Sequence, residues 1–205
     1  MARTDERGGP QTRARILEVA HGLFLERGYD RVTVAEVARG AGVSSVTVFK
    51  HFPRKEDLFL DRTDDAAQLL RAAVRDRPTG TDVLSSLRGM TGRLIDGREP
   101  LSGVDPRSAD FFRTVAESPA LIARARQIAA ELQTELGEEL RSDPAFSGDP
   151  DLFAALFIAG YTTVMVQTAG RVIAGESSAE LVNDHRARFE RMFDALSHGV
   201  QGGLR

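Results

Sequence analysis

Helical spacing of the apolar residues is the feature that most constrains the fold of this chain. Ile16, Ala20 and Phe24 recur at intervals of four residues, and a longer stripe of the same kind runs over residues 121–140. Such spacing places apolar side chains on one face of an α-helix. No segment of the 205 residues alternates apolar and polar side chains as a half-buried strand does. The sequence therefore predicts an all-α fold of about nine helices.

The residue types that are missing exclude several classes of protein. The chain has no cysteine, which excludes a disulfide scaffold, a thiol nucleophile and zinc–thiolate or iron–sulfur sites. It also lacks the HExxH, GxGxxG, P-loop and GxSxG patterns. We therefore expect a protein that is not an enzyme, with no catalytic residues, metal or cofactor.

The charge is unevenly distributed along the chain. A net charge of −3 argues against a uniformly basic surface for nucleic acid, but it does not exclude a local basic face. Residues 1–62 contain 11 basic and 9 acidic side chains, whereas the remainder contains 16 and 21. The asymmetry weakly favours an N-terminal part that faces DNA.

One stretch of the chain is apolar enough to raise the question of a membrane. Residues 152–166 form the longest apolar stretch, but it is shorter than a membrane span and includes Gly160 and three hydroxyl-bearing residues. We therefore expect a buried helix here. Residues 1–7 carry charges of both signs with no apolar segment behind them, so they do not resemble a signal peptide. The sequence predicts a soluble, cytoplasmic protein without a membrane partner.

Glycine, proline and polar residues indicate where the domains divide. Residues 1–11 are polar and contain glycine and proline, which is typical of a flexible arm. Residues 12–54 hold a first helix, which Thr12 can cap, and two shorter helices. Residues 55–205 form a larger helical domain, and its first helix, over residues 55–76, links it to the smaller domain.

The two short helices carry their own start and stop signals. Thr33 and Glu36 have the spacing of a capping box, and Ser44 can cap the second short helix. Gly42 permits a tight turn between the two helices. A longer helix followed by two short helices with a glycine-containing turn is the helix-turn-helix pattern. Short polar side chains on the second short helix suit close approach to the major groove of DNA.

Residues 33–59, TVAEVARGAGVSSVTVFKHFPRKEDLF, resemble the DNA-binding signature of the TetR/AcrR family of bacterial transcriptional regulators. The resemblance is strongest over residues 12–60, and the rest of the chain is similar only in length and helical layout. It implies a ligand-responsive regulator, a repressor that binds a palindromic double-stranded operator as a homodimer. A small, largely apolar effector would release it.

The resemblance also implies which side chains contact DNA. Thr33 and Lys55 would bind phosphates, Ser45, Val46 and Thr47 would face base edges, and Val46 would meet a thymine methyl. The family most often has tyrosine where this chain has Phe49, so Phe49 as ordinary core is an alternative. The expected DNA-binding residues are Thr33, Ser44, Ser45, Val46, Thr47, Phe49, Lys50, His51 and Lys55.

Large apolar residues in the second domain predict an effector pocket and a dimer interface. The alternative for both sets is that they complete a filled core. The expected pocket residues are Met90, Leu94, Phe111, Phe112, Val115, Ile128, Phe157, Tyr161 and Met165, with residues 97–106 as a gate. The expected dimer residues, on the last two helices, are Phe153, Val164, Phe189, Met192, Phe193 and Leu196.

Two functional alternatives stay open at the level of the sequence. The helix-turn-helix could act only through protein partners, and binding to specific DNA that weakens steeply with salt would separate that case. Activation rather than repression is the second alternative, because the fold does not set the sign of regulation.

Overall fold

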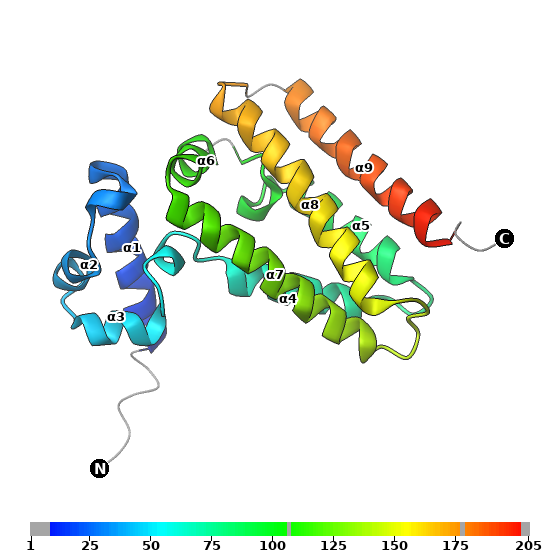
Figure 1. Ribbon diagram of the computed structural model, residues 1–205, viewed down its shortest axis with the longest axis horizontal. Coiled ribbons are helices and arrows are strands. Elements are labelled where there is room, and N and C mark those ends of the chain that lie inside the picture. Colours follow the sequence, from blue (N-terminus) through cyan, green and yellow to red (C-terminus); the bar gives the residue numbers. More distant parts are fainter. Residues whose placement is uncertain (1–8, 106–107, 177–178, 202–205) are drawn as a thin grey trace, which may run out of the picture. The chain divides into compact units, whose positions relative to one another are not determined.

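The computed structural model describes residues 9–105, 108–176 and 179–201 (Figure 1). Over these residues the chain forms nine α-helices and three short 3-10 helices without any strand, which confirms the predicted all-α fold. Most of the predicted arm, residues 1–11, lies outside the described residues. In chain order the α-helices are α1 (Gly9–Arg27), α2 (Val34–Gly40), α3 (Ser45–His51), α4 (Thr63–Arg75), α5 (Val83–Asp96), α6 (Ser108–Glu117), α7 (Pro119–Arg141), α8 (Pro150–Ile173) and α9 (Ala179–Gln201).

The chain divides into two compact units. The first unit comprises Met1–Asp61 and Thr114–Arg124. The second unit comprises Arg62–Arg113 and Ala125–Arg205. The division after Asp61 falls later than the one expected after residue 54, because Leu58 and Phe59 are buried in the core of the first unit. Leu121 is buried in that same core. The sequence contained no signal that a segment so distant in the chain belongs to the first unit.

α1 supplies the centre of the first unit. Its buried face consists of Ile16, Ala20 and Phe24, as their spacing predicted. The expected cap at Thr12 is wrong, because α1 begins at Gly9 and Thr12 lies inside the helix. After the last turn, Gly28 has a φ of 81°, which residues with a side chain rarely adopt. Glycine at this position lets the chain leave α1 sharply toward α2.

The linking helix expected over residues 55–76 is not continuous. A 3-10 turn over Glu56–Leu58 is followed by turns and a bend over residues 59–62, and α4 begins only at Thr63. Burial explains the interruption, since the chain bends where Leu58 and Phe59 enter the core of the first unit.

α8 and α9 lie side by side in the second unit (Figure 1). α8 begins as the sequence predicted, with Pro150 in its first turn and the Asp149 carboxylate accepting hydrogen bonds from two backbone N–H groups at 3.0 Å. The two helices bury a cluster of aromatic residues in the core of this unit. Its members are Phe153, Phe157, Phe189 and Phe193.

α8 contains the longest apolar stretch of the sequence. Among the described helices it alone is long and apolar enough to cross a membrane, a property that core helices of soluble proteins share. One third of its most apolar window is buried within the unit. The predicted core helix therefore keeps a second, exposed apolar face, on which Leu152, Leu156 and Val166 lie.

Arginine–carboxylate pairs connect the segment that contains α4 to the end of α7. They are Arg71–Glu135, Arg75–Glu139 and Arg77–Asp143. Arg77 and Asp143 are joined at 2.5 Å, and each side chain is only 12% exposed. The segments that these pairs join are more than 60 residues apart in the sequence.

Candidate nucleic-acid interface

Local hydrogen bonds fix the starts of α2 and α3. The backbone N–H of Glu36 donates to Thr33 Oγ1 at 3.3 Å, and the N–H of Thr33 donates to the Glu36 carboxylate at 2.8 Å. At α3, the N–H of Thr47 donates to Ser44 Oγ at 3.1 Å. Gly42, between the helices, has a φ of 64°. The predicted capping box, cap and turn are therefore confirmed.

The inner faces of α2 and α3 are buried together with α1. Val37 and Ala38 of α2 are buried, as are Val48 of α3 and Phe52 directly after it. The guanidinium of Arg13, on α1, lies 4.9 Å from the centre of the Phe52 ring. This packing fixes α3 by one face and determines which side chains point away from the core.

The opposite face of α3 is open to solvent. Val46 is 67% exposed and Phe49 is 48% exposed, and Lys50 is exposed as well. A helix advances about 100° per residue, so Val46 lies nearly opposite the buried Val48 and is flanked by Phe49 and Lys50. Phe49 is thus not an ordinary core residue. Three of the expected DNA-binding residues share one outward face.

The hydroxyl groups at the helix starts are already engaged. Thr33 Oγ1 donates to the Glu36 carboxylate at 2.8 Å, so a phosphate contact by this hydroxyl would require the capping box to open. Hydrogen bonds from Thr33 and the nearby Arg27 guanidinium lower the pKa of Glu36 to about 2. At α3, Ser44 Oγ lies 2.9 Å from Thr47 Oγ1.

The two lysines of the chain occupy different environments. Lys55 Nζ donates to the backbone carbonyl of Tyr29 at 2.7 Å and lies 4.1 Å from the centre of the Tyr29 ring. Partial burial lowers the pKa of Lys55. Lys50 instead projects from the exposed face of α3. The structure thus leaves the Lys50 side chain exposed to solvent and turns Lys55 toward the backbone of Tyr29.

The remaining residues of this region border the exposed face. Ser45 is half-buried at the start of α3, and the half-buried ring of His51 lies 6.4 Å from the ring of Phe52. Tyr29 and Arg13, which anchor Lys55 and Phe52, were not identified from the sequence. No motif marks them, because their roles depend on contacts with residues that lie 26 and 39 positions away in the chain.

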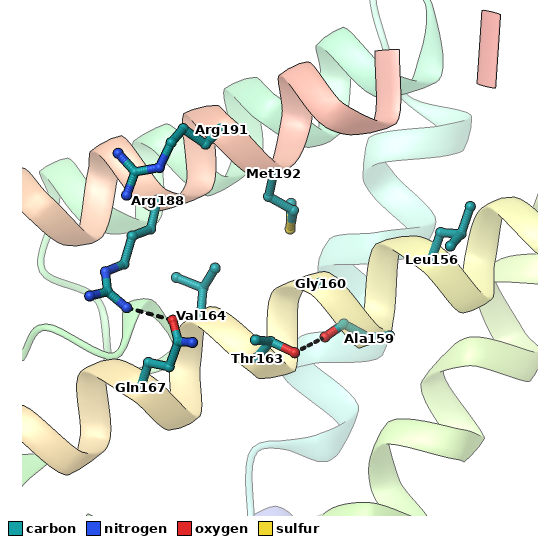
Figure 2. Close-up of a pocket in the computed structure, with 9 residues that line it drawn as sticks. All are labelled: Leu156, Ala159, Gly160, Thr163, Val164, Gln167, Arg188, Arg191 and Met192. Carbon is teal, nitrogen blue, oxygen red and sulfur yellow. Dashed lines mark hydrogen bonds between the residues drawn. The ribbon is translucent and has the colours of Figure 1, made fainter. Parts of the chain in front are cut away.

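Most of the expected dimer residues lie inside the second unit. Phe153, Val164, Phe189, Phe193 and Leu196 are buried in its own core, and Met192 is partly buried. The outward side of α8 and α9 instead forms a hollow of about 510 Å³ (Figure 2). It is lined by Leu156, Ala159, Gly160, Thr163, Val164, Gln167, Arg188, Arg191 and Met192.

The expected pocket residues are also distributed over several places. Met90 and Leu94 line a second hollow, of about 540 Å³, together with α4 and residues 99–101. Phe157 lies in the core, with Tyr161 and Met165 packed against it, while Val115 packs against the core of the first unit. Phe111 is exposed, and Phe112 and Ile128 are partly buried.

Part of the chain matches a known family. Residues 16–61 match the family described as bacterial regulatory proteins, tetR family. The matched segment begins in α1 and runs through α2, the turn and α3.

Similarity to individual proteins extends further along the chain. The HTH-type transcriptional regulator TcmR of Streptomyces glaucescens is 28% identical over 194 residues, which cover 91% of this chain and 83% of TcmR. AcrR of Shigella flexneri, also an HTH-type transcriptional regulator, is 39% identical over 59 residues, 29% of this chain and 27% of AcrR.

A solved structure shares the fold. It is that of FadR of Thermus thermophilus, a TetR-family transcriptional repressor in complex with lauroyl-CoA. It has a TM-score of 0.58 and 23% identity over 94% of this chain and 96% of FadR. The proteins that this chain resembles are therefore transcriptional regulators and not enzymes.

Proposed function

Because the chain belongs to the tetR family of bacterial regulatory proteins, we propose that this DNA-binding transcriptional regulator is a repressor. In this proposal it binds a palindromic operator as a homodimer and leaves the operator when a small, largely apolar effector binds. The observation that carries the proposal is α3, which is held by its buried Val48 and presents Val46, Phe49 and Lys50 to solvent.

The exposed face of α8 and α9 supports a homodimer. A pair of helix-turn-helix units on a two-fold axis presents its recognition helices about 34–36 Å apart, one turn of DNA. Leu156, which lines the hollow of Figure 2, is 44% exposed, and Val166 of α8 is 71% exposed. A second copy would cover this apolar surface by a symmetric contact. The proposed contact therefore uses the outward residues of these helices and not the buried phenylalanines.

Close packing of the two helices makes this face continuous. Figure 2 shows Met192 of α9 directed toward Gly160 of α8. A Cβ atom at Gly160 would lie 2.8 Å from the Met192 sulfur, so a larger residue there would have to displace the Met192 side chain. Arg188 Nη1 also donates to Gln167 Oε1 at 2.5 Å. The pair can therefore offer one surface to a partner copy.

The hollow beside α4 and α5 is the proposed effector site. Its volume of about 540 Å³ is in the range of small-molecule sites, and Leu69, Met90 and Leu94 make part of its wall apolar. The rest of the wall includes the charged and polar residues Arg62, Asp65, Gln68, Arg93 and Glu99. An acyl chain such as that of the lauroyl-CoA bound by FadR belongs to this class of ligand. Such a ligand releases DNA only if it binds the DNA-free conformation more tightly.

The loop at one side of this hollow is anchored to α8 and α9. Tyr161 Oη donates to the Leu101 carbonyl at 3.3 Å, and His185 Nε2 lies 2.8 Å from the Ser102 carbonyl oxygen. Burial lowers the pKa of His185, so the neutral ring donates through Nε2 and accepts from Thr168 through Nδ1. An occupant of the hollow that displaced this loop would act on the helices proposed for the dimer.

Selection of DNA by the full chain tests the proposal. We expect a pool of random duplexes to yield a palindromic sequence that binds two chains, with an affinity that falls steeply as salt increases. Enrichment of no sequence would overturn the proposal and favour action through protein partners. A reporter gene with the selected site over its promoter then separates repression from activation by the sign of the change in expression.

Sedimentation of two matched variants tests the dimer. Val166→Arg places a charge on the exposed face of α8, and we expect it to produce monomers at micromolar concentration. Leu25→Arg changes an equally exposed apolar residue of α1 and should leave the dimer intact. Dimers of unchanged stability with Val166→Arg would overturn the proposed interface.

A further inference from the structure

The chain passes between the two units at three places, and they differ in stiffness. After Asp61 it leaves the first unit within the turns and bend of residues 59–62. After Arg113 it returns within α6, and after Arg124 it leaves again within α7, and neither helix is interrupted there. A helix carries a displacement along its length, whereas a turn can absorb it. Residues 114–124, the inserted segment, are therefore joined to the second unit by helix at both ends.

The inserted segment completes the apolar core of the first unit. Leu121 is fully buried in the same cluster as Ile16, Phe24 and Phe59, and Val115 packs against this cluster. Without Leu121 the core would contain a cavity. The core that supports the helix-turn-helix is thus incomplete without a side chain from the start of α7.

Two polar contacts tie the inserted segment to the chain on either side of the helix-turn-helix. The buried Ser118 donates from Oγ to Asp30 Oδ1 at 3.1 Å, and Asp30 lies between α1 and α2. Arg124 Nε donates to Asp57 Oδ1 at 2.7 Å. The other oxygen of Asp57 accepts the backbone N–H of Arg54 at 3.1 Å, just after α3 ends. The segment therefore holds the chain before α2 and after α3.

The three contacts lie on one side of the inserted segment. Ser118, Leu121 and Arg124 follow each other at intervals of three residues, which places them along one side of the first turns of α7. The side chains of Arg124 and Asp57 are only 11% and 15% exposed, so water cannot readily replace either partner. One apolar and two directional polar contacts together fix the orientation of α2 and α3 on this segment.

We propose that Ser118, Leu121 and Arg124 are positioning residues, which hold α3 in the orientation that binds DNA and through which the second unit controls that binding. The proposal rests on the proposed function and adds to it the route by which the second unit acts on α3. None of the three residues has to touch DNA. A rearrangement of the second unit that displaces α6 or α7 would break the contacts with Asp30 and Asp57 and allow α3 to turn.

Two matched arginine variants of the full chain test the positioning. The probe is the duplex selected by the unchanged protein, and affinities are expressed per folded chain, with the folded fraction taken from circular dichroism. We expect Arg124→Met to bind this duplex about tenfold more weakly, within the usual range of coupling between sites. Arg126→Met removes the same charge from an exposed position of α7 and should bind as the unchanged protein does. Both variants should bind an unrelated duplex equally well, because that binding depends on charge and not on the orientation of α3.

A milder variant covers the case in which Arg124→Met does not fold. Ser118→Ala removes a single hydroxyl group and leaves the Asp57 contact in place. We expect it to weaken binding to the selected duplex about fivefold and to leave binding to the unrelated duplex unchanged.

Hydrogen exchange tests the same coupling in the opposite direction. If the inserted segment positions α3, binding of DNA must stabilise the segment by the same factor, because coupling is reciprocal. We expect the selected duplex to slow amide exchange over residues 114–124 and onward into α7 about tenfold. Arg124→Met should abolish this slowing, and Arg126→Met should retain it.

The outcomes separate this inference from the function on which it rests. Affinities per folded chain that are unchanged in Arg124→Met and Ser118→Ala overturn the positioning role, because the contacts then only stabilise the fold. Slower exchange that is confined to residues 9–61 overturns the route through α7. Both results leave DNA binding intact. An unchanged protein that selects no duplex overturns the proposed function itself.

Discussion

In the first unit, local caps and aromatic packing hold α1, α2 and α3, and one ion pair, Arg124–Asp57, ties in the distant segment 114–124. In the second unit, a row of three charge pairs joins the segment that contains α4 to the end of α7. In the first unit the rings of Phe24, Tyr29 and Phe59 lie 5.1–5.9 Å apart. In the second, Arg77 pairs with Asp143, 66 residues away. Caps and aromatic packing around α1 can keep α3 in one orientation, while a row of ion pairs between helices allows each contact to be made or broken separately.

The largest expected effect is a loss of stability in the first unit alone. Phe52→Ala removes a ring that is buried between α3 and α1, and we expect the unit to lose about 3–5 kcal/mol of unfolding free energy. DNA binding should disappear while sedimentation still shows a dimer. Denaturation followed by circular dichroism, together with binding to the selected duplex, measures both effects.

A phenylalanine three residues earlier provides the control. Phe49→Ala removes the same side chain from the exposed face of α3, so unfolding should change by only about 0.5 kcal/mol. Equal destabilisation by Phe52→Ala and Phe49→Ala would contradict the assignment of the two faces. Loss of the dimer in Phe52→Ala would contradict the independence of the two units.

A slightly smaller effect is expected for the charge pairs of the second unit. Arg77→Met leaves the Asp143 carboxylate buried without its cation and removes the bond from Nε to the Thr81 carbonyl, at 3.0 Å. We expect a loss of about 3 kcal/mol of unfolding free energy. Arg141→Met breaks the exposed pair with Asp151 and should cost about 0.5 kcal/mol or less.

A double variant sharpens this contrast. Arg77→Met combined with Asp143→Leu removes both charges, so much of the lost stability should return. If the double variant is as unstable as the sum of the single changes, the pair is not coupled and the comparison between the units fails.

What the sequence could predict follows the same division. The caps at Thr33 and Ser44 and the buried stripe of α1 depend on residues three or four positions apart, and all were predicted correctly. The pairing of Glu139 with Arg75 was not, because an acid on a helix is usually solvated and no local pattern identifies a partner 64 residues away.

At the candidate site, too, contacts between residues far apart in the chain could not be predicted from the sequence. The resemblance identified α3 and its flanking residues, but it could not show that Lys55 is bonded to the Tyr29 carbonyl. The apolar character of Phe153 and Phe189 predicted burial without saying whether a second copy or the unit's own core buries them. Only the three-dimensional packing separates the inward face of α8 from the outward one.

The two lysines give a prediction about DNA binding in the first unit. Lys50→Ala should reduce the slope of log affinity against log salt by about one for each subunit, the signature of a lost phosphate contact. Lys55→Met should leave that slope unchanged and lower the unfolding free energy by about 1 kcal/mol, since the bond to Tyr29 and the contact with its ring are lost. Equal slopes for both variants would contradict the different roles.

The smallest expected effect concerns the pH dependence of the first unit. Bonding to Thr33 and Arg27 lowers the pKa of Glu36 from 4.5 to about 2, so folding favours the ionised carboxylate. Its contribution to stability is complete above pH 4.5 and is lost as the pH falls toward 2. Glu36→Gln should therefore remove part of the fall in the unfolding midpoint between these pH values. Glu18→Gln, which changes an exposed acid of α1, is the control. Identical pH profiles for the Glu36 variant and the unchanged protein would contradict the role of the capping box.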